Sequence, residues 1–162
     1  MRPAFVAVVA LLLALAIACG GGGGNDRDDD GGGSLATATI SLVGVTGQRA
    51  ELTVELARTA AERSRGLMFR EELAEERGML FVHQGETKGG FWMKDTKIAL
   101  SIAFIAGDGT ILETQDMEPL SKALHRPART YRWALEVNQG WFERHGLGSG
   151  DRVEIPADVT AE

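Results

Sequence analysis

The sequence predicts a strand-dominated α+β domain, built on a small curled sheet or a β-barrel-like core with two or three short helices. Apolar and polar residues alternate with a period of two in several short runs, which is typical of strands with one buried face. Turns separate these runs at short intervals, as in curled sheets and small barrels. We expect short helices that close the ends of the curl.

The first two strands are expected to form a hairpin. Residues 37–42 and residues 51–56 alternate between polar and apolar side chains, and the glycine-bounded residues 44–47 supply the turn. A short helix should follow, because Thr59 and Glu62 have the spacing of a capping box, in which each side chain binds a free N–H group of the other. We expect it to end near residue 66.

The central part of the chain is expected to hold the buried strands. Another helical turn or two are predicted over residues 71–76. Residues 78–82 form a compact apolar run, and residues 98–106 are almost wholly apolar, which favours a strand covered on both faces. Residues 106–109 contain Asp-Gly, the dipeptide of tight hairpin turns, so residues 110–117 should return as a strand.

The C-terminal part is expected to contain a loop, a strand, a short helix, a turn and a final strand. In order, these occupy residues 119–127, 131–137, 141–145, 148–151 and 152–155. Asn138 is the expected N-cap of that helix, and Gly146 its end.

The N-terminus has the features of an export signal. Arg2 supplies a positive charge, and residues 4–18 are all apolar, a stretch too short to span a bilayer and typical of a signal peptide. Small residues precede Cys19, the single cysteine, in an arrangement that resembles a bacterial lipobox, with Ala16 where leucine is usual. We therefore expect residues 1–18 to be a lipoprotein signal peptide and Cys19 to be lipidated. An ordinary secreted protein or an uncleaved anchor is the alternative.

Residues 19–34 are rich in glycine and aspartate and are expected to be a flexible linker between the lipid and a single domain over residues 35–158. The three aspartates at residues 28–30 lack the distal Glu of an EF-hand calcium loop, so a solvated linker is the preferred interpretation. The predicted location is outside the cytoplasm, on a membrane.

Composition excludes several classes of function. The formal net charge is −6 and no basic block is present, so nucleic-acid binding is not expected. A single cysteine excludes an intrachain disulfide framework and a cysteine-cluster zinc site. Four methionines suggest Cu(I) binding, but each lies in an apolar run where methionine usually fills the core. These are Met68, Met79, Met93 and Met117. We expect no metal and no cofactor.

Several motifs carry a family resemblance over about residues 48–156. They are Gly66-Leu67-Met68-Phe69-Arg70, Gly78-Met79-Leu80-Phe81, Phe91-Trp92-Met93-Lys94-Asp95-Thr96, Ile102-Ala103-Phe104-Ile105, Leu135-Glu136-Val137-Asn138 with Gly140, and Gly150-Asp151. In order and spacing this set resembles the domain of unknown function 192 family. The resemblance implies a compact strand-rich domain that is often exported or lipid-anchored in bacteria, and it brings no established activity.

Three positions depart from what is common in that family. Asp95 stands where the family commonly has Asn, Ser101 where it has Asp, and Ala106 where a further Asp is frequent. If the family's chemistry uses the acid at the position of Ser101, this chain cannot perform it in the same way. The departure weakens an enzymatic interpretation.

The first candidate binding site is the segment around Trp92. Its indole is a candidate stacking wall, and Lys94 and Asp95 are candidate polar contacts. The structural alternative places Phe91 and Met93 in the core, Trp92 over an edge and the Lys94–Asp95 pair on the surface.

The second candidate combines Arg70, Glu136 and Asn138. An Arg–Glu pair at a strand end is suited to binding a carboxylate or a sugar. The structural alternative is that the pair fixes the helix to the barrel and that Asn138 is only an N-cap.

These observations favour a non-catalytic binding or accessory module of the cell envelope. It would contact the membrane through the lipid on Cys19 and bind an unknown small molecule or an envelope protein. One alternative is a small enzyme that acts on a cell-envelope carbohydrate, with Asp95 and Glu136 as acid and base. Another is an envelope scaffold protein.

Overall fold

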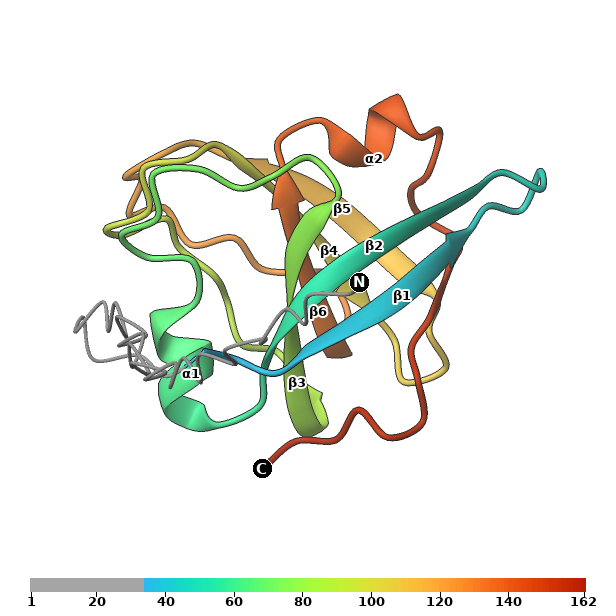
Figure 1. Cartoon of the computed structure of the whole chain (residues 1–162), viewed down its shortest axis with the longest axis horizontal. Helices are drawn as coiled ribbons and strands as arrows, with labels where there is room; N and C mark the ends of the chain where they lie inside the picture. The colour runs from blue at the N-terminus through green and yellow to red at the C-terminus, as the bar shows by residue number, and fades with distance from the viewer. Residues whose placement is uncertain (1–33) are drawn as a thin grey trace, which may run out of the picture. The chain divides into compact units, whose positions relative to one another are not determined.

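The computed structural model describes residues 34–162, which form a seven-stranded sheet with two short helices (Figure 1). The strands follow the spatial order β5-β4-β6-β3-β2-β1-β7. Their bounds are β1 Thr37–Val43, β2 Arg49–Ala57, β3 Arg77–Thr87, β4 Leu100–Ile105, β5 Ile111–Met117, β6 Tyr131–Asn138 and β7 Arg152–Glu154. The helices are α1 Ala60–Arg65 and α2 Trp141–Arg144. The strand-dominated α+β class is therefore confirmed. The predicted signal peptide and Cys19 lie outside the described residues.

The predicted hairpin is present as β1 and β2. The strands are antiparallel and place Ile40 opposite Leu52, both of which are buried. Polar side chains alternate with them on the opposite face, among them Glu51, which is exposed. The turn depends on Gly47, whose φ of +94° is a conformation that glycine adopts without a Cβ clash. The period-two pattern thus located both strands.

Helix α1 begins and ends where its sequence signals predict. The Glu62 amide donates to the Thr59 hydroxyl at 3.2 Å, and the Thr59 amide donates to the Glu62 carboxylate at 2.8 Å. The helix ends at Gly66. It lies in the connection between β2 and β3, which are the one parallel pair among the described strands.

The helical turns expected over residues 71–76 are not formed. This segment is a loop, and its carbonyl groups at Leu73 and Ala74 accept hydrogen bonds from the side-chain amide of Asn138, at 2.8 and 3.2 Å. A donor from a distant strand therefore replaces the donors of a helical turn. The prediction that Asn138 is the N-cap of the following helix is also wrong. Asn138 is the last residue of β6, and the N-cap of α2 is Gly140, which has no side chain to form a cap.

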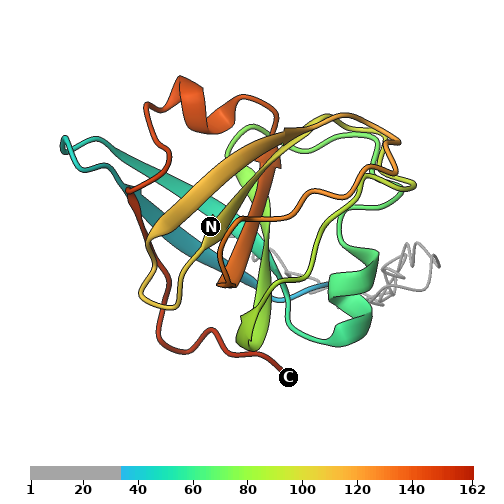
Figure 2. The same ribbon diagram turned by 180° about the vertical axis from the view of Figure 1, so that it is seen from behind.

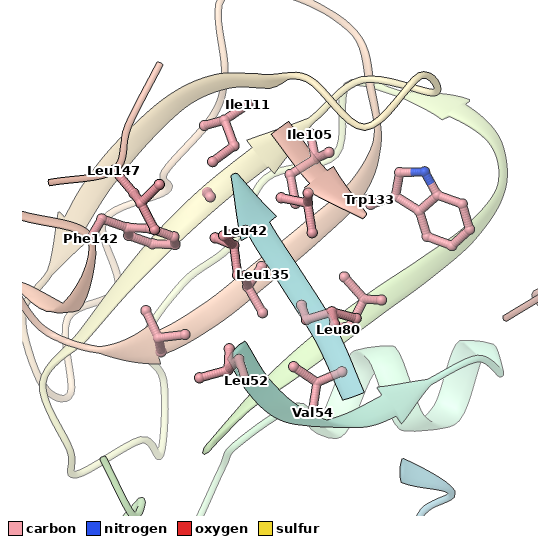
Figure 3. Packing of buried hydrophobic residues seen from close by; sticks show 14 of the residues in the cluster. Leu42, Leu52, Val54, Leu80, Ile105, Ile111, Trp133, Leu135, Phe142 and Leu147 are labelled. Atoms are coloured by element: carbon pink, nitrogen blue, oxygen red, sulfur yellow. The ribbon is translucent and has the colours of Figure 1, made fainter. Parts of the chain in front are cut away.

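The interior of the curled sheet holds the larger hydrophobic cluster. Leu42 from β1, Leu80 from β3 and Leu135 from β6 point toward one another in Figure 3. Phe142 and Leu147, from α2 and the turn after it, pack at one side of the same cluster. Helix α2 therefore covers one end of the curl, as the sequence predicted. Every residue of β4 is buried, in agreement with its almost wholly apolar sequence.

The two outer strands of the sheet meet at one corner. The Ile111 amide donates to the Asp151 carbonyl at 2.8 Å, and the Val153 amide donates to the Gly109 carbonyl at 2.8 Å. A Cβ on Gly109 would lie 2.5 Å from the Val153 carbonyl oxygen, so only glycine allows this approach. These bonds join β5 to β7 at one corner of the curled sheet, which is barrel-like as predicted.

The outer face of strands β3, β6 and β4 is covered by three loops rather than by a helix. They comprise residues 66–76, 88–99 and 118–130, and they run together beside the sheet in Figures 1 and 2. A second hydrophobic cluster lies on this face, with Met79 and Phe104 among its buried members. No helix among residues 34–162 is long and apolar enough to cross a membrane.

Candidate functional site

Backbone hydrogen bonds connect the three loops into one unit. The Phe69 amide donates to the Asp95 carbonyl at 2.8 Å. The Met93 amide donates to the Ser121 carbonyl at 2.9 Å, and the Leu120 amide donates to the Thr96 carbonyl at 2.9 Å. Because backbone groups make these bonds, the three loops hold one another in place without relying on flexible side chains. This unit, together with the strand ends beneath it, carries all six candidate residues.

The segment around Trp92 alternates between core and surface. Met93 is buried, and Phe91 packs edge-on against Phe81 with 4.9 Å between ring centroids. Trp92 is 47% exposed. The Lys94 ammonium lies 5.6 Å from the indole centroid and 3.7 Å from the carboxylate of the neighbouring Asp95. This geometry agrees with the structural alternative, in which Phe91 and Met93 belong to the core and the Lys94–Asp95 pair lies on the surface. Trp92 still offers an accessible aromatic surface.

Arg70 and Glu136 do not form the pair that the sequence suggested. The Arg70 guanidinium contacts the Glu55 carboxylate at 2.5 Å, because the loop after α1 places it beside the outward-facing side chains of β2. Glu136 lies in β6, where its register neighbours are Met79 in β3 and Ile102 in β4. The two predicted partners therefore have different neighbours: Arg70 contacts a carboxylate of β2, and Glu136 lies between apolar residues of β3 and β4.

Glu136 is a carboxyl group placed among apolar neighbours. It is 5% exposed, and no donor among residues 34–162 makes a hydrogen bond to its carboxylate oxygens. Removal from water disfavours the charged form and raises the pKa of Glu136 to about 8. Asn138 follows two residues later and binds the loop carbonyl groups described above. Glu136 is therefore mostly protonated at neutral pH.

A shallow, open cavity of about 560 Å³ lies beside Asn138, and we call it the Asn138 cavity. Its lining comprises Glu72, Leu73, Glu75, Ile98, Ala99, Asn138, Gln139 and Arg144. Arg144 is held in place by Glu75, at 2.6 Å, and by the Gln139 carbonyl, at 2.9 Å. The cavity thus combines a fixed cation, carboxylates and amides with an apolar wall. Its volume is in the range of small-molecule sites.

A second cavity, of about 380 Å³, surrounds Ser101. The Ser101 hydroxyl donates to the Asp116 carboxylate at 2.5 Å and accepts from the Gly140 amide at 2.9 Å. Glu143 also lines this cavity. The acid that the family commonly has at position 101 is thus replaced by a hydroxyl that binds an acid on the adjacent strand β5. Ser101 and Asp116 face each other in register.

The residues with metal-binding chemistry are dispersed over the described part of the chain. No three His, Cys, Asp or Glu side chains of residues 34–162 are grouped closely enough to hold a metal ion. Met79, Met93 and Met117 are buried in the second hydrophobic cluster, where they fill the core. Neither of the two cavities described above is lined by Asp95 or Glu136, and no ion pair or hydrogen bond within residues 34–162 joins these two residues.

The sequence analysis identified Asn138 as a candidate residue but missed the other residues that line the Asn138 cavity. Glu72, Glu75, Gln139 and Arg144 are spaced like ordinary surface residues, and their grouping depends on the loop of residues 66–76 lying beside the end of β6. It also missed three exposed apolar side chains, at Phe69, Leu120 and Leu124. The sequence signal that would have identified these three residues is their apolar character within loops rich in charged residues.

The fold and the two cavities define a small strand-dominated domain with a curled seven-stranded sheet and an open site of ligand size. The sequence profile of the DUF192 family, described as "Uncharacterized ACR", matches residues 42–155. The chain belongs to this family, as the motifs indicated. The family assignment brings no established activity.

Several solved structures resemble the chain. One is a protein from Sinorhizobium meliloti described as a candidate transcription regulator, with 37% sequence identity, a TM-score of 0.74, and coverage of 76% of this chain and 97% of that one. Another is a protein of unknown function from Novosphingobium aromaticivorans, with 35% identity, a TM-score of 0.71, and coverage of 75% and 86%. No curated protein matches the chain significantly.

Proposed function

We propose that this protein is an extracytoplasmic lipoprotein whose domain binds a small polar molecule in the Asn138 cavity without chemically changing it. The single observation that carries this proposal is the composition of the cavity. Glu72, Asn138 and Gln139 offer hydrogen-bond acceptors and donors, Arg144 offers a fixed positive charge, and Ile98 contributes to an apolar wall. None of the residues that line it is a Ser, Cys, Thr or His, so it lacks the usual nucleophiles and bases of peptide and ester hydrolysis.

Sugar fragments that carry a carboxylate fit this set of groups best. Hydroxyl groups both donate and accept hydrogen bonds, so they pair with amides and carboxylates alike. The apolar face of a sugar ring packs on aliphatic side chains, and a guanidinium binds a carboxylate. Soluble peptidoglycan fragments combine these chemical groups, and they occur where an exported protein would meet them.

The proposed location rests on the N-terminal sequence. A basic residue, a short apolar stretch and small residues before Cys19 agree with lipidation and export. The linker of residues 19–34 would let the domain stand away from the membrane. Cell fractionation and mass measurement of the full chain test this part. Membrane association with a lipid on Cys19, lost in Cys19→Ser, is expected; a soluble, unmodified wild-type protein would contradict it.

Binding is tested by calorimetric titration of the full chain with soluble peptidoglycan fragments. Glu72→Ala and Gln139→Ala should each weaken binding, by about fivefold or more, since a hydrogen bond to ligand contributes about 1 kcal/mol. Glu51→Ala removes an exposed carboxylate from β2 and is the matched control for Glu72→Ala. Equal affinity of all three variants and the wild type would place the site elsewhere.

A carbohydrate-active enzyme is a second candidate, favoured by one observation. The raised pKa of Glu136, about 8, supplies a carboxyl group that holds its proton at neutral pH, as a general acid requires. Asp95 would act as the base from an exposed loop. Turnover of cell-envelope oligosaccharides that is lost in Glu136→Gln and in Asp95→Ala, with both variants folded, would favour the enzyme over the binding module.

A further inference from the structure

Four large apolar side chains project from the three adjoining loops, and we call them the loop platform. Phe69 is 61% exposed, Leu120 is 59% exposed, and Trp92 and Leu124 are each 47% exposed. Only Val45, in the turn of the β1–β2 hairpin, is another large hydrophobic residue exposed to this degree among residues 34–162. Solvent-exposed apolar residues scattered singly need no explanation, whereas a group of them marks an interaction surface.

The backbone fixes the loop platform in its exposed arrangement. Phe69 and Leu120 have φ values of +67° and +60°, in the left-handed region that large side chains rarely adopt. Asp95, at φ +57°, is the remaining non-glycine residue with positive φ among residues 34–162. Each of the three lies in the loop unit, and the amides of Phe69 and Leu120 are bonded to neighbouring loops. Leu124 is close to Gly90, in the same loop as Trp92.

Two of the three loops that carry the loop platform have a charge opposite to that of the remaining domain. Residues 88–97 and 118–129 contain six of the fifteen basic residues of the described domain, but two of its nineteen acidic residues. The basic residues are Lys88, Lys94, Lys97, Lys122, Arg126 and Arg129; the acidic ones are Asp95 and Glu118. The rest of the domain is strongly acidic, and it includes the third loop, residues 66–76, which holds Arg70 and four glutamates. An anionic partner is therefore attracted to the two loops that carry Trp92, Leu120 and Leu124.

We propose that the loop platform docks onto the surface of a membrane that contains anionic lipids. The four side chains project from loops instead of lining either described cavity, so they suit a bilayer interface, which adapts to their shape. Tryptophan prefers this interface, and lysine side chains reach from it to lipid phosphates. Trp92 and Lys94 form such a pair, because the Lys94 ammonium lies 5.6 Å from the centroid of the Trp92 indole.

Because of the proposed lipid anchor, even a weak affinity of the loop platform for the bilayer is sufficient to keep it docked. This step rests on the proposed function. A glycine-rich linker of the length of residues 19–34 has a mean end-to-end distance of about 20 Å, so the anchored domain stays close to the bilayer at a high effective concentration. The loops that carry Phe69 and Trp92 also contribute Leu73 and Ile98 to the Asn138 cavity. Docking would therefore hold this cavity close to the membrane surface.

Tryptophan fluorescence tests the proposal directly. The chain has three tryptophans, of which Trp133 and Trp141 are buried and Trp92 is exposed. The full lipidated chain is reconstituted into vesicles of brominated phosphatidylcholine, with or without phosphatidylglycerol. Insertion of the loop platform predicts quenching that is stronger with phosphatidylglycerol and absent in Trp92→Phe. A vesicle-bound wild-type chain with no quenching in either membrane would overturn the proposal.

Charge variants provide a matched comparison. Lys94→Glu and Lys122→Glu should each weaken docking to phosphatidylglycerol vesicles by at least about fivefold, because one cation at an anionic surface accounts for about that factor. Arg49→Glu makes the same charge change at an exposed site in β2, away from the loops, and should leave the quenching unchanged. Equal effects of all three variants would indicate general charge attraction and overturn docking through the loop platform.

Failure of the anchor and failure of docking give different results. If the chain carries no lipid on Cys19, the proposed function fails, and docking is decided by adding vesicles to the chain in solution. Quenching of Trp92 then supports docking, and its absence overturns it. Shielding of Trp92 that depends on protein concentration in the absence of vesicles would assign the loop platform to a second copy of the chain and would also overturn the proposal.

Discussion

The Phe69 amide donates to the Asp95 carbonyl at 2.8 Å, and both residues have left-handed backbone conformations. This bond joins the loop after α1 to the loop between β3 and β4. It therefore links a segment that contacts β2, through Arg70 and Glu55, to the loop that carries Trp92 and Lys94. The exposed aromatic surface of the protein is thus part of a unit supported by distant parts of the chain.

Substitutions at Asp95 should show how much the left-handed backbone matters. Asn tolerates positive φ at least as well as Asp, so Asp95→Asn should change the free energy of unfolding by less than about 0.5 kcal/mol. Asp95→Val forces a β-branched residue into the same conformation and should cost about 1–3 kcal/mol. Urea unfolding measures both. Thr39→Val, at an exposed position in an ordinary strand, is the control and should be nearly neutral.

Gly109→Ala should open the corner where β5 meets β7. The new Cβ would lie 2.5 Å from the Val153 carbonyl oxygen, and the residue has a φ of +92°. We expect a loss of about 1–3 kcal/mol in the free energy of unfolding, from the clash and the strained backbone. Gly148→Ala is the matched control, since nothing lies within 4 Å of its added Cβ. Equal melting temperatures for the two variants would refute a tight contact at this corner.

Ser101→Asp, which restores the acid common in the family, should destabilise this chain. Its carboxylate would face Asp116 across the β4–β5 register, and two adjacent like charges disfavour ionisation of both. We expect a cost of about 1–3 kcal/mol at neutral pH. Adding Asp116→Ser exchanges the two groups and should recover most of the lost free energy of unfolding. A double variant as unstable as the sum of the single variants would show that the pair is not coupled.

Glu136 should make stability fall as pH rises. Its carboxyl pKa is about 8 in the folded protein and near the ordinary 4.5 when unfolded, so between these values the folded state holds the extra proton. Linkage then requires the free energy of unfolding to decrease as pH rises through this window, by about 1.4 kcal/mol per pH unit at most. The window from about pH 7 to 9 avoids His83, whose pKa is lowered by burial and by Arg63.

Glu136→Gln should remove this dependence. The neutral amide has no proton to lose, so unfolding curves of the variant at about pH 7 and about pH 9 should nearly coincide while those of the wild type separate. At the higher pH the variant should be the more stable of the two proteins. A wild type whose stability is unchanged over this window would mean that the carboxyl group ionises without cost in the folded state.

The sequence located the strands well because a period of two reports local burial. Residues 37–42 and 51–56 became β1 and β2, and the Thr59–Glu62 capping box marked the start of α1. Each of these signals acts between residues close in the chain. The helical turns expected over residues 71–76 did not form, because the competing donor was Asn138, more than sixty residues away.

The candidate sites were predicted less well for the same reason. The pair of Arg70 with Glu136 required knowledge of which side chain lies opposite which, and the structure places Glu55 beside Arg70. The segment around Trp92 was found because its residues are consecutive. The Asn138 cavity was not found, since its lining comes from three separated parts of the chain.

The sequence by itself determined the fold class, the family and the positions of most strands, because alternation, turn residues and capping are local properties. Only the tertiary structure decided which loops meet, that Glu136 is a buried acid without a hydrogen-bond donor among the described residues, and that Phe69, Trp92, Leu120 and Leu124 are exposed on adjoining loops. These features depend on contacts between residues far apart in the chain, whose free energies are set by packing and desolvation rather than by local conformational preference.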